Sequence, residues 1–164
     1  MRISTRARYA LKLMLDISKN AKDGAPIHLG EIASRNKLSR GYLEQLVISL
    51  KNSQLVRGVS GRKGGYWLAR PPENISLLEI IQATIGPINL VECVQQPESC
   101  IRSEFCECRV LWQLLTHKIT EVLAEYSLKD FSEKEGIQKM YEELVQYEGK
   151  TGCPEVTEAS PKVL

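Results

Sequence analysis

The chain has 164 residues, of which 43% are hydrophobic and 26% charged, as in a globular protein of one domain, or of one compact domain plus an appendage. No run of about 18 apolar residues and no secretory signal pattern occurs, so we expect no membrane contact and a cytoplasmic location. Residues 1–70 carry 14 Lys and Arg against 4 Asp and Glu, whereas the remainder carries 8 against 16. This asymmetry favours a polyanionic partner such as nucleic acid for the first half, with a solvated basic face as the alternative.

The first half shows three helical patterns followed by a hairpin pattern. Apolar residues at helical spacing predict a helix over residues 5–20, a short helix over 29–38, and a third helix over 40–53 that Ser39 caps. The apolar stripe of the third helix consists of Leu43, Leu46, Val47 and Leu50. Apolar runs on either side of a glycine-rich tip predict a β-hairpin over 55–70. This order of elements is that of a winged helix-turn-helix.

The second half is predicted to be helical around a cysteine-rich loop. A capping box from Ser76 to Glu79 opens a helix that Gly86 ends, and the loop spans about 91–108. From Val110 onward, a long amphipathic helix carries more apolar surface than one short neighbouring helix would cover. We therefore expect this helix to pack against a second copy of the chain, with an ordinary intrachain core as the alternative.

The predicted fold class is mainly α with a small β-hairpin wing, in which a winged helix-turn-helix is joined to a long dimerisation helix. A second capping box, from Ser132 to Glu135, is expected to open the last helix. The expected regions are the winged helix-turn-helix (1–72), the cysteine loop with the dimerisation helix (73–130), the C-terminal helix (131–150) and a disordered tail (151–164).

The start of the third helix and the tip of the hairpin carry the candidate DNA-binding residues. In a winged helix-turn-helix, this helix lies in the major groove and presents its N-terminal side chains to base edges. Gln45 suits adenine because its amide both donates and accepts, and Glu44 suits cytosine because its carboxylate accepts from the amine. At the tip, glycines let the backbone approach a narrow groove. The alternatives are exposed helix residues and a solvated turn. The full candidate set is Ser39, Arg40, Tyr42, Glu44, Gln45, Ser60, Arg62 and Lys63.

Four of the five cysteines form a cluster that suggests metal chemistry. The spacing is Cys93-x6-Cys100-x5-Cys106-x-Cys108, and all four are candidate metal ligands. Thiolates ligate both iron–sulfur clusters and zinc, but structural zinc usually takes CxxC-like pairs, which are absent here. The spacing therefore favours an iron–sulfur cluster, with zinc and metal-free thiols as alternatives. The fifth cysteine, Cys153, is expected to have no role.

Signatures of an enzyme are missing from the sequence. We find no nucleophile–base arrangement, phosphate-binding loop or dinucleotide fingerprint. Only His28 and His117 are available for general acid–base chemistry near neutral pH. We therefore do not expect catalysis.

Residues 1–130 resemble the IscR-type family of bacterial winged-helix regulators. The matching pieces are RYAL (8–11), MLD (14–16), YLEQL (42–46), GGYWLAR (64–70) and SLLEIIQATIGP (76–87), followed by three cysteines and the long helix. The resemblance implies a homodimer that binds double-stranded promoter DNA, with Glu44 and Gln45 reading bases and the wing entering the minor groove. At one wing position some members carry an arginine, and this chain has Ser60, with Arg62 two residues on.

The resemblance also implies an iron–sulfur cluster, 2Fe–2S rather than 4Fe–4S, held by Cys93, Cys100 and Cys106. Several members place a histidine three residues after the third cysteine, where this chain has Arg109, a poor ligand. Others take an acidic ligand from the partner's first helix, where this chain has Arg8. Cys108 is therefore the first candidate for the fourth ligand, with a spare thiol as the alternative.

The expected function is a transcription regulator, acting as a repressor, whose promoter binding responds to the cluster. Its expected targets are genes for cluster assembly, iron, or redox and nitrosative stress, with cluster-assembly proteins as cluster donors. The alternative is a cluster-free winged-helix regulator of cysteine and sulfur metabolism that acts through a partner protein or a metabolite.

Overall fold

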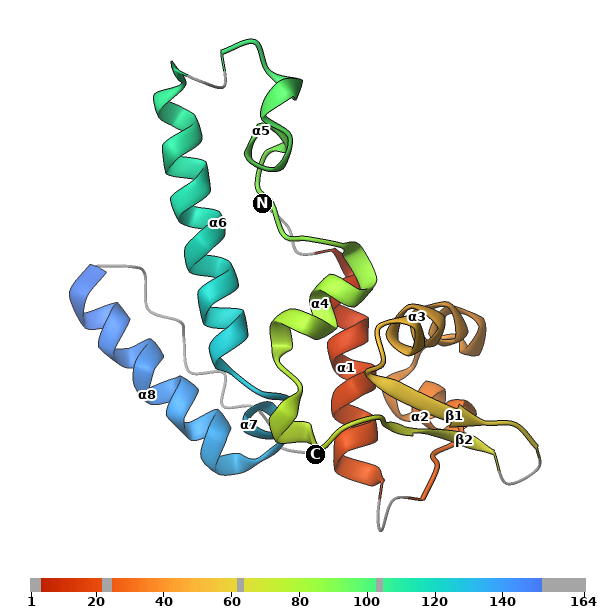
Figure 1. Ribbon diagram of the computed structural model, residues 1–164. Coiled ribbons are helices and arrows are strands. Elements are labelled where there is room, and N and C mark those ends of the chain that lie inside the picture. Colours follow the sequence, from red (N-terminus) through yellow and green to blue (C-terminus); the bar gives the residue numbers. More distant parts are fainter. Residues whose placement is uncertain (1–3, 22–24, 62–63, 103–104, 152–164) are drawn as a thin grey trace.

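The computed structural model describes residues 4–21, 25–61, 64–102 and 105–151 (Figure 1). The first half contains α1 (Thr5–Asn20), α2 (Leu29–Asn36), α3 (Arg40–Asn52), β1 (Val56–Val59) and β2 (Gly65–Leu68). The second half contains η2 (Pro72–Asn74), α4 (Leu77–Ile85), α5 (Glu92–Gln95), η3 (Pro97–Ser99), α6 (Glu107–Glu125), α7 (Leu128–Ser132) and α8 (Lys134–Thr151). The fold is mainly helical with a two-stranded antiparallel hairpin, which confirms the predicted fold class.

Helix α1 forms the centre of the core. In Figure 1, α2, α3 and the hairpin lie on one side of it, and α4 and α7 lie on the other. The helix buries Ala7, Ala10, Leu13, Met14 and Ile17. The predicted stripe of α3 is confirmed, since Leu43, Leu46, Val47 and Leu50 are all buried. A continuous apolar core therefore holds the helix-turn-helix in place.

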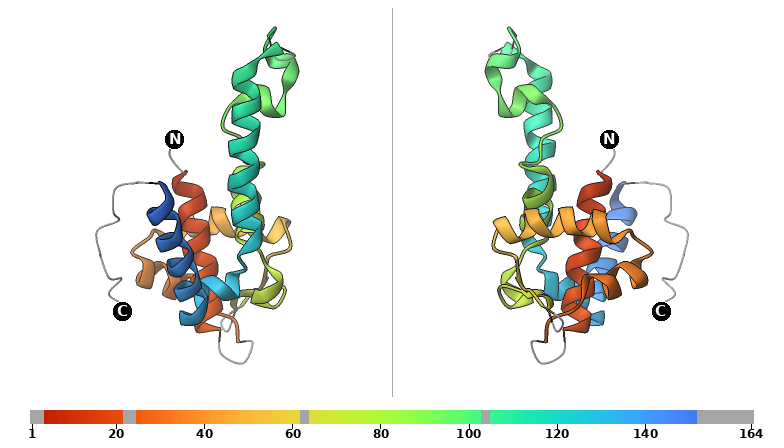
Figure 2. Two further views of the ribbon diagram at one scale, coloured as in Figure 1. Left: turned by 90° about the vertical axis from the view of Figure 1, so that its left-hand side faces the viewer. Right: turned by 90° about the vertical axis from the view of Figure 1, so that its right-hand side faces the viewer.

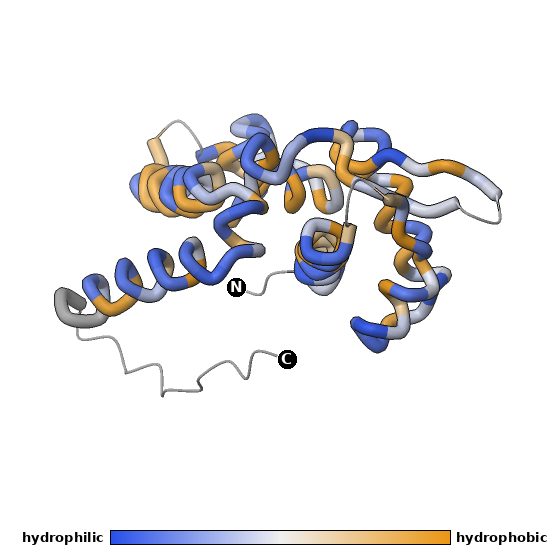
Figure 3. The backbone as a smooth tube through the Cα atoms, turned by 90° about the horizontal axis from the view of Figure 1, so that it is seen from below, coloured by the Kyte–Doolittle hydropathy of each residue, from blue (hydrophilic) through white to orange (hydrophobic). Residues whose placement is uncertain are grey.

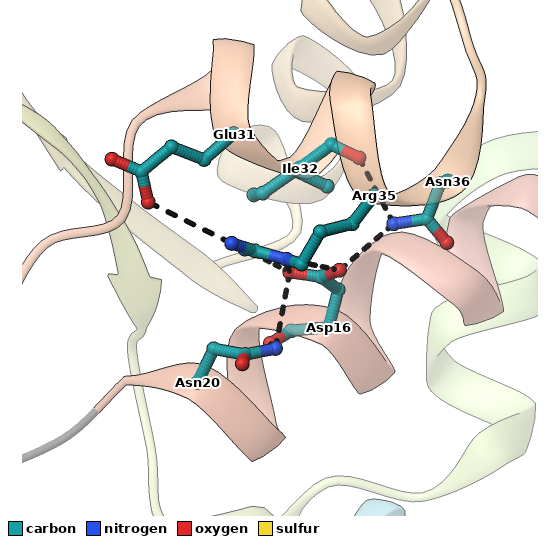
Figure 4. A network of polar contacts seen from close by, with 6 residues as sticks. All are labelled: Asp16, Asn20, Glu31, Ile32, Arg35 and Asn36. Atoms are coloured by element: carbon teal, nitrogen blue, oxygen red, sulfur yellow. Dashed lines mark hydrogen bonds and ion pairs between the residues drawn. The ribbon is translucent and has the colours of Figure 1, made fainter. Parts of the chain in front are cut away.

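A polar network fastens α1 to α2 (Figure 4). The guanidinium of Arg35 donates to Asp16 from Nη2 over 2.5 Å and from Nε over 3.0 Å. Asn36 adds a hydrogen bond from Nδ2 to the same carboxylate over 2.8 Å. The Asp16 side chain is only 8% exposed, and the hydrogen bond with it raises the pKa of Arg35 above its ordinary value. The network fixes how α2, and the turn after it, sit on the core.

The hairpin is tied back to the core by a third extended segment. Ile27 and Tyr66 exchange two backbone hydrogen bonds of 2.9 Å, so the residues before α2 pair with β2. A Cβ atom at Gly65 would lie 2.5 Å from the carbonyl oxygen of Ile27. Only glycine allows this close approach, which accounts for one member of the glycine pair at the tip.

Helix α6 stands out from the body of the molecule. Figures 1 and 2 show it rising beside α4, with α5 packed near its outer end. At its inner end the chain returns to the core through a backbone bridge, in which Leu77 donates to Tyr126 over 3.0 Å and Leu128 donates to Ile75 over 2.7 Å. The cysteine segment therefore lies at the far end of α6, away from the core.

Two boundaries in the second half differ from the predictions. The long helix begins at Glu107 rather than Val110, because Cys106 already serves as its N-cap, and the expected loop contains α5 and η3. The capping box predicted at Ser132 is wrong: Ser132 ends α7, and its hydroxyl donates to the carbonyl of Lys129. The actual box is Ser127 with Asp130.

The final helix, α8, extends along the body from α7. Tyr126 donates a hydrogen bond to Glu143 of this helix, which raises the pKa of Tyr126 to about 12. Thr151 is the last residue of α8, and the remainder of the predicted disordered tail, 152–164, lies outside the described residues. None of the described helices is long and apolar enough to cross a membrane.

Candidate DNA-binding surface and cysteine segment

Helix α3 buries one face and leaves the other open. At its start, the hydroxyl of Ser39 accepts a hydrogen bond from the backbone of Tyr42 over 3.3 Å, which satisfies one of the free amides of the first turn. Ser39 is thus the helix cap, as predicted. The exposed side of the helix carries Arg40, Gly41, Glu44, Gln45 and Ile48. This is the face that a winged helix-turn-helix turns toward DNA.

Two of the exposed candidates form an ion pair. Arg40 donates from Nε to Glu44 over 2.9 Å, one helical turn away, and the two side chains are 73% and 50% exposed. Such exposed pairs contribute only about 0.3–0.5 kcal/mol, so the partners can separate readily. The pair compensates the negative charge of Glu44 on the exposed face of α3.

Tyr42 differs from the other candidates on α3 because it is half-buried. Its ring packs edge-on against Tyr9 of α1, with ring centroids 5.8 Å apart. Arg8 and Lys12 lie over the Tyr9 ring at 5.8 and 5.7 Å. The aromatic pair therefore locks the start of α3 onto α1 and leaves only part of Tyr42 available to a ligand.

The first turns of α1 bring further cations to this surface. Arg6 donates from Nη2 to the hydroxyl of Ser49 over 3.0 Å, which places an exposed guanidinium beside α3. Arg6 is not among the site residues predicted from the sequence. Its signal was the basic pattern of the first helix, but the contact depends on how α1 crosses α3.

The hairpin tip is the predicted wing. Ser60 and Gly61 are exposed, and Gly61 has φ of 119°, a conformation that favours glycine. Arg62 and Lys63, the predicted cationic residues of the wing, lie outside the described residues. The described strands confirm a hairpin that pairs Val56 with Leu68 and Val59 with Gly65.

The cysteines do not form a ready-made metal site. Cys93 is in α5, Cys100 directly follows η3, and Cys106 caps α6; all three are half-buried free thiols. Cys108 lies in the first turn of α6 and is exposed. Thiolates have the right chemistry for a cluster, but over 4–21, 25–61, 64–102 and 105–151 no three Cys, His, Asp or Glu side chains come together as a metal site. Ligation would require the segment to rearrange.

Arg109 occupies the position where the resemblance would place a histidine ligand. Its guanidinium donates from Nε to the backbone carbonyl of Cys93 over 3.0 Å. The side chain therefore links α6 to the helix that carries the first cysteine. Arg109 therefore makes a backbone contact at the position where some members of the family have a metal ligand.

Helix α6 has one side toward its own chain and another that is open. Trp112, Ile119 and Leu123 are half-buried on the first side. The open side carries Val110, Leu111, Leu114, Leu115 and Val122, which are 66%, 51%, 55%, 39% and 50% exposed. Figure 3 views α6 nearly end-on, beside the mainly hydrophilic α8. The single chain thus leaves much of the predicted apolar stripe uncovered.

The helix-turn-helix, the paired hairpin and the open face of α3 define a DNA-binding winged-helix protein. Comparison with known proteins agrees. Residues 3–134 match the Rrf2 family, described as iron-dependent transcriptional regulators. The chain belongs to the Rrf2 family, and its relatives are named transcriptional regulators, not enzymes.

The relatives include two differently named kinds of regulator. The regulator CymR of Bacillus subtilis is 38% identical over 142 residues, covering 86% of this chain and 97% of the relative. The regulator IscR of Xenorhabdus nematophila is 35% identical over 130 residues, covering 79% of this chain and 78% of the relative. The IscR resemblance is thereby confirmed, and CymR is an equally similar second relative.

Solved structures show the same division. The structure of CymR, described as the global cysteine regulator of B. subtilis, has a TM-score of 0.66 at 36% identity, and the match covers 80% of this chain and 96% of that one. The structure of T. potens IscR has a TM-score of 0.64 at 31% identity and covers 80% and 85%. The fold is therefore common to both kinds of regulator.

Proposed function

We propose that this regulator binds promoter DNA as a homodimer and that an iron–sulfur cluster on its cysteine segment governs this binding. Two features of the chain support this proposal: the open face of α3, and four free cysteines at the outer end of α6. In the proposed binding mode, Glu44 and Gln45 contact base edges while Arg40 and the wing contact phosphates.

Cys93, Cys100 and Cys106 are the proposed ligands, and Cys108 is the first candidate for the fourth. The bound cluster would supply redox sensitivity, and the chain's own part is to order the cysteine segment. Here the contact of Arg109 with the Cys93 carbonyl keeps the segment near α6. Since α6 joins the segment to the core, a change there can alter how two reading surfaces are spaced.

The test of the cofactor is anaerobic purification from iron-replete cells, followed by an absorption spectrum and by counting iron and sulfide. We expect a coloured protein, and Cys93→Ala, Cys100→Ala and Cys106→Ala should each abolish the chromophore. In Cys108→Ala, an unchanged spectrum and unchanged stability of the chromophore would remove Cys108 from the ligand set. A colourless, iron-free protein would contradict the cluster.

The test of regulation compares the affinity of cluster-loaded and cluster-free protein for the same promoter fragments. We expect the two forms to differ on at least one promoter. Equal affinity on every promoter would leave a DNA-binding regulator without a cluster response.

A second candidate is a cluster-free regulator of cysteine and sulfur metabolism that acts through a partner protein or a metabolite. It is favoured by the similarity to CymR and by the separation of the described thiols. Iron-free protein that binds promoters of cysteine-metabolism genes would support this reading over the first.

A further inference from the structure

An open hollow of about 550 Å³ lies between the end of α3 and the outer face of the hairpin. Its polar lining consists of Lys51, Gln54, Arg57 and Arg70, and Trp67 forms part of its wall. No acidic residue lines it among the residues the structure describes. The hollow therefore combines several cations with a flat aromatic surface.

The cations of this hollow differ in their partners. Arg70 is engaged by Glu79, with its Nη2 atom 2.8 Å from the carboxylate. Lys51 and Arg57 are exposed and have no ion pair within the described part of the chain. Two uncompensated positive charges beside each other attract a diffuse or repeating anion rather than a neutral ligand.

The two strands of the hairpin bring Arg57 and Trp67 together. They are directly opposite residues in the β1–β2 register, so their side chains lie on the same face of the ribbon. The other face carries Val56, which is buried against the core. The Arg57–Trp67 face is therefore the outer face, free to meet a partner.

Lys51 connects this hollow to the reading face of α3. It follows Glu44 by seven residues and Ile48 by three, so it continues the same exposed stripe. The rise along an α-helix places it about 10 Å beyond Glu44, a distance comparable to the ~12 Å width of the major groove. A helix that reads bases with its first turn would then carry Lys51 to the sugar–phosphate strand at the edge of that groove.

We propose that Lys51, Arg57 and Trp67 form a docking surface for the DNA backbone that flanks the bases read by α3. This proposal rests on the proposed DNA binding and adds a second phosphate-contacting surface to it. Lys51 and Arg57 contact phosphate oxygens, and Trp67 packs against the neighbouring sugar. The contribution is independent of base sequence.

The experiment measures binding to a mixed-sequence duplex of about three helical turns, ~30 base pairs, over a series of salt concentrations. Lys51→Ala and Arg57→Ala are each expected to lower the slope of log Kobs against log salt by about 0.9, and the double variant by about twice that. The ratio of specific to non-specific affinity should stay unchanged. Lys134→Ala, an exposed lysine at the start of α8, is the matched control and should keep the slope.

A fluorescence measurement distinguishes DNA from a small anion as the ligand of the hollow. The sequence has two tryptophans, so Trp112→Phe leaves Trp67 as the only one. Duplex should change the Trp67 emission, whereas inorganic phosphate should not. A response to phosphate without a response to duplex would overturn the proposal.

The outcomes also separate this proposal from the proposed function. An unchanged salt slope in the double variant, with normal duplex binding by the parent protein, would overturn the docking surface alone. Absence of duplex binding by the parent protein would overturn both. Melting curves of the variants confirm that each is folded, and Lys51→Arg should retain the slope because it retains the charge.

Discussion

At the scale of single residues, the exposed face of α3 carries one pair of opposite charges that compensate each other. Arg40 is the only described partner of Glu44, and the pair lies on the surface with both side chains largely open to solvent. Close to DNA, phosphates attract Arg40 and repel Glu44. The two residues are therefore expected to contribute to binding as a coupled unit.

We expect Arg40→Ala to weaken duplex binding by about 1 kcal/mol, since it removes a cation and leaves Glu44 uncompensated. On a duplex of unrelated sequence, where Glu44 reads no base, Glu44→Gln in that background should recover much of the loss because it removes the repelled charge. A double-mutant cycle by fluorescence anisotropy at fixed salt should give a coupling of about 0.5–1 kcal/mol. Strictly additive effects would show that the ion pair has no part in DNA binding.

Another residue-scale feature lies in the turn between α2 and α3. Lys37 has φ of 53° and ψ of 44°, a left-handed conformation that costs an L-residue about 1–2 kcal/mol. Its backbone amide closes α2 by donating to the carbonyl of Ser34 over 3.3 Å. The turn is thus built with a residue other than the glycine that suits this conformation.

Lys37→Gly is expected to raise the free energy of unfolding by about 1 kcal/mol, because glycine adopts the left-handed conformation without strain. Urea denaturation monitored by circular dichroism measures the change. Lys37→Ala is the control, since it removes the charge and keeps the Cβ atom. Equal stabilisation by both variants would assign the effect to charge instead of backbone strain.

At the scale of elements, the return of the chain from α6 to the core depends on a cap. Ser127 and Asp130 form a reciprocal capping box at the start of α7, next to the backbone bridge with Ser76. Hydrogen bonds from Ser127 lower the pKa of Asp130 below its ordinary 3.8. The ionised form of Asp130 is therefore the one that stabilises the fold.

Ser127→Ala should lower the free energy of unfolding at neutral pH by about 1 kcal/mol, the usual contribution of an N-cap. Because the folded-state pKa of Asp130 is lowered, its contribution is present above the unfolded pKa and is lost as the pH falls through the folded pKa. The difference between parent and variant should therefore shrink below about pH 4. Urea titrations over a pH series measure it, and a deficit that is constant with pH would contradict this account.

Element boundaries were predicted well where a local signal marks them. The caps at Ser39 and Ser76 were correct because an N-cap is a matter of a few neighbouring residues. The error at Ser132 has the same origin, since its sequence also fits a capping box. The capping box forms at Ser127 instead, because the backbone bridge to Ser76 holds that residue against the core. No local sequence pattern reveals this bridge.

At the scale of the whole molecule, the exposed side of α6 is an apolar surface that one chain leaves uncovered. The stripe defined above is apolar along most of the helix, and Ile101 and Phe105 of the cysteine segment are also exposed, at 101% and 90%. Contiguous apolar surface of this kind marks an interface. A second copy of the chain is the proposed occupant, because the same stripe on each copy would be buried by the other.

Leu114→Asp is expected to shift the protein from dimer to monomer, since it places a charge in the centre of the stripe. Analytical ultracentrifugation over a concentration series measures the change in dissociation constant. Gln113→Asp is the matched control: it adds the same charge on another side of α6 and should leave the dimer intact. A parent protein that sediments as a monomer at all concentrations would contradict the interface.

Part of the candidate site could be predicted from the sequence, and part of it could not. The sequence identified α3, the wing and the cysteines, because helical spacing, glycine pairs and cysteine spacing are local patterns. It could not place Arg6 beside Ser49, or Lys51 beside Arg57 and Trp67, because those meetings depend on how helices and hairpin cross.

The sequence by itself determined the class of fold, the buried face of α3, the excess of cations in the first half and the cluster of cysteines in the second. Only the tertiary structure decided that Asp16 would hold Arg35 and that Arg109 would contact the backbone of Cys93. The physical reason is the distance along the chain over which each kind of interaction acts. Periodicity and capping act over one or two turns, whereas these contacts join residues far apart in the chain and exist only once the core has fixed the relative positions of the helices.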